Sequence, residues 1–84
     1  MRKATVKLFA SLSEHLPEGA KENAAQINLE DGATISSVLA ELGVPEELCY
    51  LVLLNGVFVP PSQRNSATVA EGDILSVWPP VSGG

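Results

Sequence analysis

The sequence predicts a small α+β domain, in which a sheet of four to five strands is covered on one face by one main helix. Three features predict it: two segments of alternating polarity near the N-terminus, one segment with helical periodicity after them, and several short apolar segments in the second half. A chain of 84 residues is long enough for one domain with a modest core. We therefore expect a single domain over residues 1–78, followed by a flexible tail over residues 79–84.

Two strands are expected before the helix. Residues 3–8 alternate between apolar and polar side chains, which is the two-residue period of a half-buried strand. Residues 11–16 are a candidate helical turn that Pro17 ends. Residues 24–29 then alternate again and form the second expected strand.

The strongest local pattern is a helix over residues 35–42. Its apolar side chains recur at positions i, i+3, i+4 and i+7, a stripe that must cover a sheet: Ile35, Val38, Leu39 and Leu42. Thr34 is a good cap for the first turn. Gly43 stands where helices commonly end, and Pro45 follows two residues later, so both ends of this helix are marked.

Three strand segments are expected after the helix. Residues 50–54 are continuously apolar, as in a strand that is buried on both faces or lies at the centre of the sheet. Asn55-Gly56 suits a type I′ turn into a short strand over residues 57–59. Glu71-Gly72-Asp73 then turns the chain into a last strand over residues 74–78, from which the tail begins.

Composition and charge exclude several classes of partner. The formal net charge is −5, and the five Lys and Arg residues are scattered, which argues against nucleic-acid binding. The longest apolar run, residues 48–54, is too short to cross a bilayer, so we expect no membrane partner. The single cysteine, Cys49, cannot form an internal disulfide or build a zinc site. We therefore expect a cytoplasmic protein that binds no metal.

Three residues inside the domain could carry chemistry. Cys49 has no basic neighbour in its apolar run that would activate its thiol, so we expect a packed structural cysteine. His15 beside Glu14 resembles an acid–base pair, but neighbours on a short turn point apart, and we expect an exposed surface histidine. Arg64 lies in a polar loop and is expected to be an ordinary solvated arginine.

The last residues of the sequence are the strongest functional signal. They read Trp78-Pro79-Pro80-Val81-Ser82-Gly83-Gly84. Two glycines lack β-carbons and can thread a channel that is too narrow for side chains. The prolines fix an extended backbone, so the tail should leave the domain as an arm. We therefore expect the carboxylate of Gly84 to be the functional group.

The whole pattern resembles a β-grasp, ubiquitin-like protein. The resemblance rests on the order of strands and helix, on Asn55-Gly56, on Glu71-Gly72-Asp73 and on the terminal Gly-Gly. The ending Pro-Pro-Val-x-Gly-Gly is similar to that of the MoaD/ThiS family of ubiquitin-like sulfur carrier proteins, most of all to the small subunit of molybdopterin synthase. Family members commonly carry phenylalanine where this chain has Trp78. The resemblance implies a mixed sheet and an extended Gly-Gly tail.

The resemblance also implies a function. The chain would be a carrier without an active site or bound cofactor of its own, and a ubiquitin-activating-type enzyme would use Mg-ATP to adenylate Gly84. Sulfur from a cysteine desulfurase or a rhodanese-like protein would then replace AMP. The resulting thiocarboxylate would donate sulfur in molybdopterin synthesis, in complex with the large subunit of molybdopterin synthase.

In this interpretation Gly84 reacts, and the partner-binding residues are Gly83, Ser82, Val81, Pro80, Pro79, Trp78 and Phe58. Phe58 could belong to an exposed apolar patch on the sheet, although core packing explains such residues equally well. Three alternatives stay open. The carrier could serve the thiamine pathway and bind a thiazole synthase. It could be a covalent modifier that is passed to lysines, or a non-covalent β-grasp binding module with an incidental tail.

Overall fold

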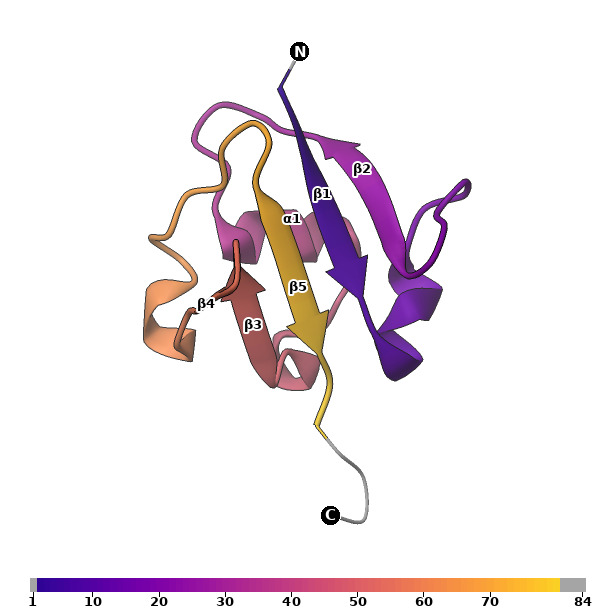
Figure 1. Cartoon of the computed structure of the whole chain (residues 1–84). Coiled ribbons are helices and arrows are strands. Elements are labelled where there is room, and N and C mark those ends of the chain that lie inside the picture. The colour runs from indigo at the N-terminus through magenta and orange to yellow at the C-terminus, as the bar shows by residue number, and fades with distance from the viewer. Residues whose placement is uncertain (1, 81–84) are drawn as a thin grey trace.

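The computed structural model describes residues 2–80, which form a five-stranded mixed sheet with one α-helix packed on one face (Figure 1). Along the chain the elements are β1 (Lys3–Leu8), η1 (Ala10–His15), β2 (Ala24–Asn28), α1 (Ile35–Glu41), η2 (Glu46–Leu48), β3 (Leu51–Leu54), β4 (Val57–Phe58), η3 (Pro61–Gln63) and β5 (Ile74–Trp78). The three η elements are short 3-10 helices. The predicted α+β architecture, a mixed sheet covered on one face by one main helix, is confirmed.

The strands lie side by side in the order β2-β1-β5-β3-β4. The central strand β5 runs parallel to β1 and antiparallel to β3, and both hairpin partners, β2 and β4, are antiparallel edge strands. The N-terminal strand and the last strand are therefore neighbours in the middle of the sheet. As a result, the chain that follows β5 leaves from the centre of the sheet and not from its edge (Figure 1).

The core fills the space between the sheet and α1. The predicted alternation in β1 is confirmed, because every second side chain of that strand is buried. The buried apolar residues of the sheet meet those of the helix: Ala4, Val6, Leu8, Val52, Leu75 and Val77 on strands, and Ile35, Val38 and Leu39 on α1. Burial of such side chains supplies most of the free energy that offsets chain ordering in a domain of this size.

Both ends of α1 are formed as the sequence predicts. The Ser37 N–H donates to Thr34 Oγ1 at 3.1 Å, and the Thr34 N–H donates to Ser37 Oγ at 2.8 Å, which makes a reciprocal capping box. At the other end Leu42 is the C-cap, and Gly43 has φ of 79°, a left-handed conformation that glycine adopts without steric cost. These two caps define where α1 begins and ends.

The predicted hairpin between β3 and β4 is also confirmed. Asn55 and Gly56 have φ of 52° and 83°, the two positive values that a type I′ turn requires. The Asn55 side chain ties this turn to the start of β5. Its Nδ2 donates to Asp73 Oδ1 at 2.9 Å, and its Oδ1 accepts from the Ile74 N–H at 2.8 Å. These two hydrogen bonds connect the β3–β4 turn to the start of β5.

The prediction that residues 50–54 are buried on both faces or central is wrong. Strand β5 occupies the centre, and β3 lies between β5 and the edge strand β4. Only Val52 is buried, whereas Leu51 and Leu53 are partly exposed and Tyr50 is 68% exposed. The physical reason is that the described helix α1 covers one face of the sheet only. The continuous apolar run therefore makes the uncovered face apolar as well.

Candidate functional site

The face of the sheet opposite α1, here called the open face, carries a band of apolar side chains. In the strand register Leu51 lies beside Trp78, and Leu53 lies between Ser76 and Phe58. Because side chains alternate along a strand, these residues point away from the core. We define the apolar band by its members: Leu51, Leu53, Phe58, Ile74 and Trp78. Phe58 is 53% exposed, so of the two interpretations left open by the sequence, exposed patch or core packing, the structure favours the exposed patch.

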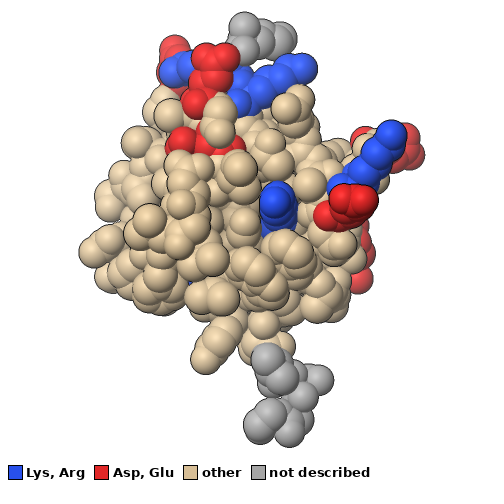
Figure 2. Space-filling model, in the orientation of Figure 1, with Lys and Arg blue, Asp and Glu red and all other residues tan. Residues whose placement is uncertain are grey.

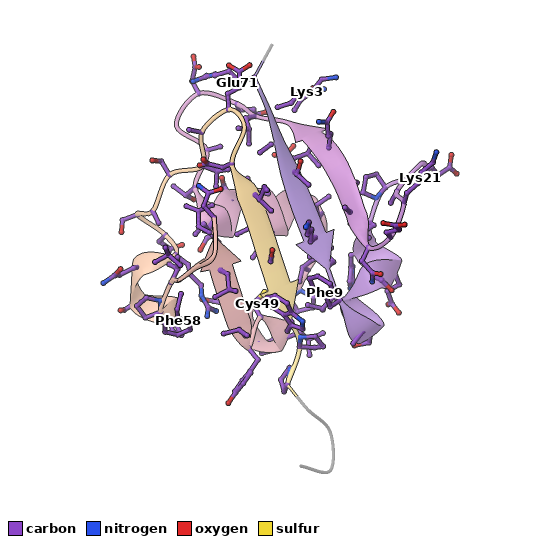
Figure 3. The ribbon with its side chains drawn as sticks, in the orientation of Figure 1. Lys3, Phe9, Lys21, Cys49, Phe58 and Glu71 are labelled. Carbon is purple, nitrogen blue, oxygen red and sulfur yellow. The ribbon has the colours of Figure 1, made fainter. Side chains whose placement is uncertain are left out.

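Charged residues lie mainly around this band. Figure 2 looks onto the open face and shows a largely uncharged surface, with charged side chains gathered at the end away from the C-terminus and beside β2. In Figure 3, Lys3 and Glu71 mark that charged end, whereas Phe9 and Phe58 lie toward the other end of the sheet. Lys7 of β1 is in register with Ser76 and shares the open face. A surface of this kind, apolar with a polar rim, is typical of a docking site for another protein.

An aromatic stack forms one end of the apolar band. Phe9 directly follows β1, and its ring lies against Trp78 with ring centroids 4.4 Å apart and an angle of 4° between the planes. The Phe9 N–H donates to the Val77 carbonyl at 3.2 Å. The next residue, Ala10, has φ of 53°, which is uncommon outside glycine and turns the chain from the sheet into η1. Phe9 therefore belongs to the same surface as Trp78.

The backbone of Trp78 is held from its other side. The N–H of Tyr50, the residue before β3, donates to the Trp78 carbonyl at 3.0 Å, next to the last β3–β5 pair, Leu51 with Trp78. Pro79 is partly exposed and Pro80 is exposed as the chain leaves the sheet (Figure 1). The other predicted partner-binding residues, Val81, Ser82 and Gly83, and the predicted reacting residue Gly84, lie outside the described residues.

The prediction that Arg64 is a solvated arginine is wrong. Its side chain is 3% exposed, and its guanidinium donates to three backbone carbonyls. The bonds are Nη1 to Cys49 at 2.6 Å, Nε to Val59 at 3.1 Å and Nη2 to Tyr50 at 3.5 Å. The polar sequence around Arg64 indicates a surface loop, but it gives no sign that this loop closes over carbonyls that need donors.

The Cys49 prediction is confirmed. The cysteine is 6% exposed, and its Sγ lies 3.5 Å from the Pro45 carbonyl oxygen. Burial raises the pKa of the Cys49 thiol above its ordinary value, and the positive charge of Arg64 opposes this only in part. At neutral pH the group is a protonated, packed thiol and a poor nucleophile.

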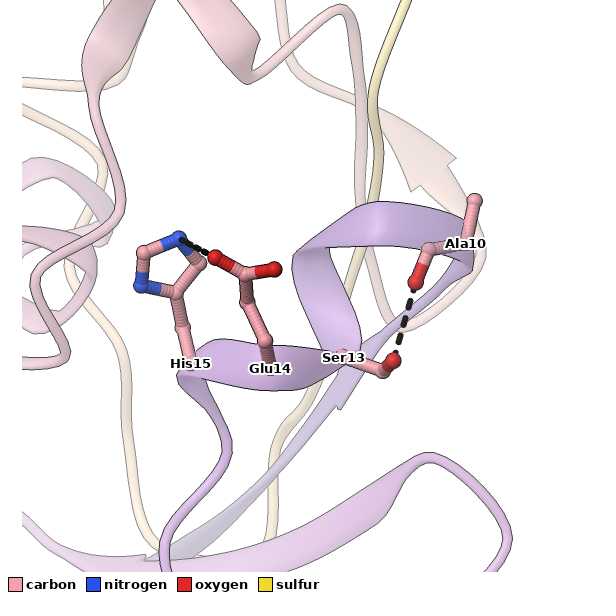
Figure 4. Close-up of polar contacts among 4 residues, drawn as sticks. All are labelled: Ala10, Ser13, Glu14 and His15. Atoms are coloured by element: carbon pink, nitrogen blue, oxygen red, sulfur yellow. Dashed lines mark hydrogen bonds and ion pairs between the residues drawn. The ribbon is translucent and has the colours of Figure 1, made fainter.

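His15 is less exposed than predicted. Its side chain is 23% exposed, because η1 packs near the end of α1, where a β-carbon on Gly43 would lie 3.9 Å from His15 Nδ1. The Nε2 atom is 4.0 Å from Glu14 Oε1, so the two side chains do approach each other, and Ser13 Oγ donates to the Ala10 carbonyl in the same turn (Figure 4). This pair lies in η1 and contains no nucleophile.

The described residues offer few other sites. Across residues 2–80, no group of three His, Cys, Asp or Glu side chains is placed to hold a metal ion. No helix in the same part of the chain combines the length and apolar character needed to cross a membrane. The open face and the start of the tail are therefore the features that call for a functional explanation.

Comparison with known proteins shows the family of the chain. The model of the ThiS family matches residues 6–84. No curated protein matches the sequence significantly. The crystal structure of SAMP1 from Haloferax volcanii is similar, with 28% identity, a TM-score of 0.65, and coverage of 98% of this chain and 99% of that chain.

Two further solved structures share the fold. The crystal structure of the H. volcanii small archaeal modifier protein 1 has 23% identity and a TM-score of 0.69, covering 96% of this chain and 100% of that chain. A chain in the protein–protein complex of subunits 1 and 2 of the molybdopterin-converting factor from Helicobacter pylori has 22% identity and a TM-score of 0.57, covering 98% and 99%. Each of these matches covers nearly the full length of both chains, so the two chains of each pair share one fold throughout.

Proposed function

The chain belongs to the ThiS family of small ubiquitin-like sulfur carriers, and we propose that its Gly84 carboxylate is converted to a thiocarboxylate that donates sulfur in molybdopterin synthesis. The observation that carries this proposal is the reach of the family match, which runs through residue 84 and so includes Gly83-Gly84. The fold supports it, because the tail begins directly after the central strand β5.

Activation would take place in an adenylating partner. A carboxylate is a poor electrophile, so one oxygen of Gly84 attacks the α-phosphorus of Mg-ATP held by a ubiquitin-activating-type enzyme, and pyrophosphate leaves. Sulfide, released by thiol reduction of a persulfide on a cysteine desulfurase or rhodanese-like protein, then attacks the acyl carbon. The bond from that carbon to the AMP oxygen breaks, AMP leaves with the electron pair, and a thiocarboxylate remains. The carrier contributes the position of one atom, while the partner supplies charge stabilisation.

The apolar band would be the docking surface for these partners. Trp78 lies in the band and also begins the tail, so a protein that covers the band receives the tail at a fixed distance. Apolar area removed from water contributes about 25 cal/mol per Å², so the exposed Phe58 and the partly exposed Trp78 are the expected anchors. The acidic net charge of −5 would steer the chain toward a basic partner surface.

The large subunit of molybdopterin synthase is the partner we favour for sulfur transfer. The H. pylori structure that shares the fold is a complex of subunit 1 with subunit 2 of the molybdopterin-converting factor. The Pro79-Pro80 pair supports the same choice, because a stiff apolar arm suits a tail that stays inserted in a catalytic subunit. The thiamine pathway, with a thiazole synthase as acceptor, is the other sulfur-carrier possibility.

A covalent modifier is the second candidate function. The observation that favours it is the similarity to SAMP1 and to the structure whose name describes a small archaeal modifier protein. In that role the Gly84 acyl carbon would pass to a lysine amine of a target protein, with loss of AMP. A ladder of conjugates in cell extracts that disappears when Gly84 is deleted would support the modifier.

The test of the proposed function is activation in vitro followed by partner binding. The purified chain is incubated with an adenylating enzyme and labelled pyrophosphate, and exchange into ATP is measured. We expect exchange with the full chain and none after deletion of Gly84, while Lys21→Ala, on an exposed turn, serves as the matched control. Calorimetry against a molybdopterin synthase large subunit and a thiazole synthase then identifies the acceptor. Binding only to the thiazole synthase would contradict the molybdopterin assignment.

A further inference from the structure

Arg64 is the buried charged side chain of residues 2–80, and none of the ion pairs among those residues involves it. Its hydrogen-bond partners are backbone carbonyls of Cys49, Tyr50 and Val59. Taking a guanidinium out of water without a carboxylate partner costs free energy, so its hydrogen bonds to backbone carbonyls must offset that cost. The position of Arg64 is therefore best explained by what its bonds hold in place.

The shortest bond holds a peptide plane that is shared with the start of the tail. The Cys49 carbonyl accepts from Arg64 Nη1 at 2.6 Å, and the Tyr50 N–H of the same peptide group donates to the Trp78 carbonyl at 3.0 Å. In a trans peptide the carbonyl and the N–H lie in one plane and point in opposite directions. Any rotation of this plane lengthens both hydrogen bonds together.

The Cys49–Tyr50 peptide lies between two elements of regular structure and belongs to neither. Cys49 has φ of −89° and ψ of 77°, so it belongs neither to η2 nor to β3. A cavity of about 240 Å³, with Leu39 and Val44 in its wall, lies against Cys49 and Arg64. The orientation of the Cys49–Tyr50 peptide therefore depends on its two hydrogen bonds as well as on the packing of the buried Cys49 side chain.

Arg64 is itself anchored to the rest of the domain. Its carbonyl accepts from the Ser36 N–H in the first turn of α1 at 3.0 Å, and its Nε bond reaches Val59 just after β4. Beyond Trp78, Pro79 and Pro80 have no N–H with which to continue the pairing of β5. The bond from Tyr50, the residue before β3, therefore holds the carbonyl of the last residue of β5.

We propose that Arg64 is a positioning residue for the reactive tail. It fixes the Cys49–Tyr50 peptide plane, and that plane fixes the Trp78 carbonyl, which sets the direction in which the tail leaves β5. The proposal rests on the proposed function in one respect only, that the tail is the reactive segment. Arg64, on the helix-covered side of the domain, thereby joins the residues that orient the tail, and with it Gly84, toward a partner enzyme.

The test compares three variants of the full chain. Arg64→Met keeps the apolar stem and removes all donors, and Arg64→Lys keeps the charge and a single donor group. Ile27→Ala removes a partly buried side chain from β2, at the opposite edge of the sheet, and is the control for a general loss of stability. Amide hydrogen exchange of Tyr50, measured against the amides of β1, reports on the hydrogen bond itself and needs no partner.

We expect Arg64→Met to raise the exchange rate of the Tyr50 amide at least tenfold, on the order of the loss of one hydrogen bond, with β1 much less affected. Arg64→Lys should give a smaller increase in this exchange rate. Ile27→Ala should leave the ratio of the Tyr50 amide exchange rate to that of the β1 amides unchanged. With an adenylating enzyme, kcat/KM should fall in the same order. This order separates positioning from stability, because Ile27→Ala loses stability without loss of kcat/KM.

Wild-type protection of the Tyr50 amide in folded Arg64→Met would overturn the proposal, as would an equal loss of kcat/KM in Ile27→Ala. If Arg64→Met does not fold, Arg64→Lys decides the same question through the same amide. Failure of the proposed function has a different signature. In that case the wild-type chain is not adenylated at all, while exchange at Tyr50 still depends on Arg64.

Discussion

The ring of Phe9 lies flat against the indole of Trp78, with centroids 4.4 Å apart, although the two residues come from opposite ends of the chain. They meet because β1 and β5 are parallel neighbours, with Leu8 beside Val77, so both strands finish at the same end of the sheet. The stack fixes the orientation of the Trp78 ring, and the tail begins directly after Trp78. Phe9 is thus a structural support for Trp78 and a part of the docking surface.

Phe9→Ala tests both roles. Loss of an aromatic stack costs about 0.5–1.5 kcal/mol beyond the lost burial, so we expect the free energy of unfolding to fall by about 1–3 kcal/mol. Binding to the partner should weaken roughly tenfold, corresponding to about 1.4 kcal/mol. Urea denaturation and calorimetry measure the two effects. Unchanged affinity, at a stability like that of wild type, would show that the stack supports neither the fold nor the docking surface.

Deletion of Gly84 should abolish adenylation and leave the thermal midpoint nearly unchanged. The reacting group is removed, whereas every core residue within the described range 2–80 lies in or before β5. Addition of one residue after Gly84 should have the same effect, because the carboxylate becomes a peptide bond. Scanning calorimetry and pyrophosphate exchange are the measurements. A large drop in the midpoint would mean that the tail contributes to the folded core.

Gly83→Val should slow activation without unfolding the domain. A β-branched side chain restricts the backbone and widens a segment that must enter a narrow channel. Gly83→Ala, which adds a β-carbon without a branch at the same position, should slow activation less and grades the steric effect. Initial rates of adenylation give the comparison, and a Gly83→Val rate equal to that of wild type would refute the steric argument.

Cys49 predicts a dependence of stability on alkaline pH. Burial raises the pKa of its thiol in the folded chain, so the folded state keeps the proton at a pH where the unfolded chain has released it. The folded chain then binds more protons, and its stability falls as pH rises from the ordinary thiol pKa toward the raised one. Below that range the contribution is fully present. In that pH range the urea midpoint of the wild type should fall with rising pH more steeply than the midpoint of Cys49→Ala. Equal pH dependence of the two midpoints would contradict the burial of the thiol.

Local patterns in the sequence predict the secondary structure well. Strands β1 and β5 begin and end at the predicted residues, and the capping and C-terminal signals around α1 place that helix to within one residue. These features depend on periodicity and on backbone preferences, which neighbouring residues determine.

Long-range contacts could not be predicted in this way. Phe9 stands one residue beyond β1, outside the alternating pattern, and only the parallel pairing of β1 with β5 brings it to Trp78. Arg64 has polar sequence neighbours, and only the folded loop reveals that three carbonyls require its donors. In both cases the partners are distant in sequence, so no local pattern records the contact.

The most direct test of the central claim is the mass of the C-terminal peptide of the chain after incubation with an adenylating enzyme, ATP and a persulfide donor. The account predicts that the peptide ending in Gly84 gains the mass difference between sulfur and oxygen, and that alkylation with iodoacetamide labels this peptide. Cys49→Ala serves as the background for this labelling, because it removes the only cysteine of the chain. An unmodified Gly84 with an enzyme that activates a known family member in parallel would contradict the claim that this chain is a sulfur carrier.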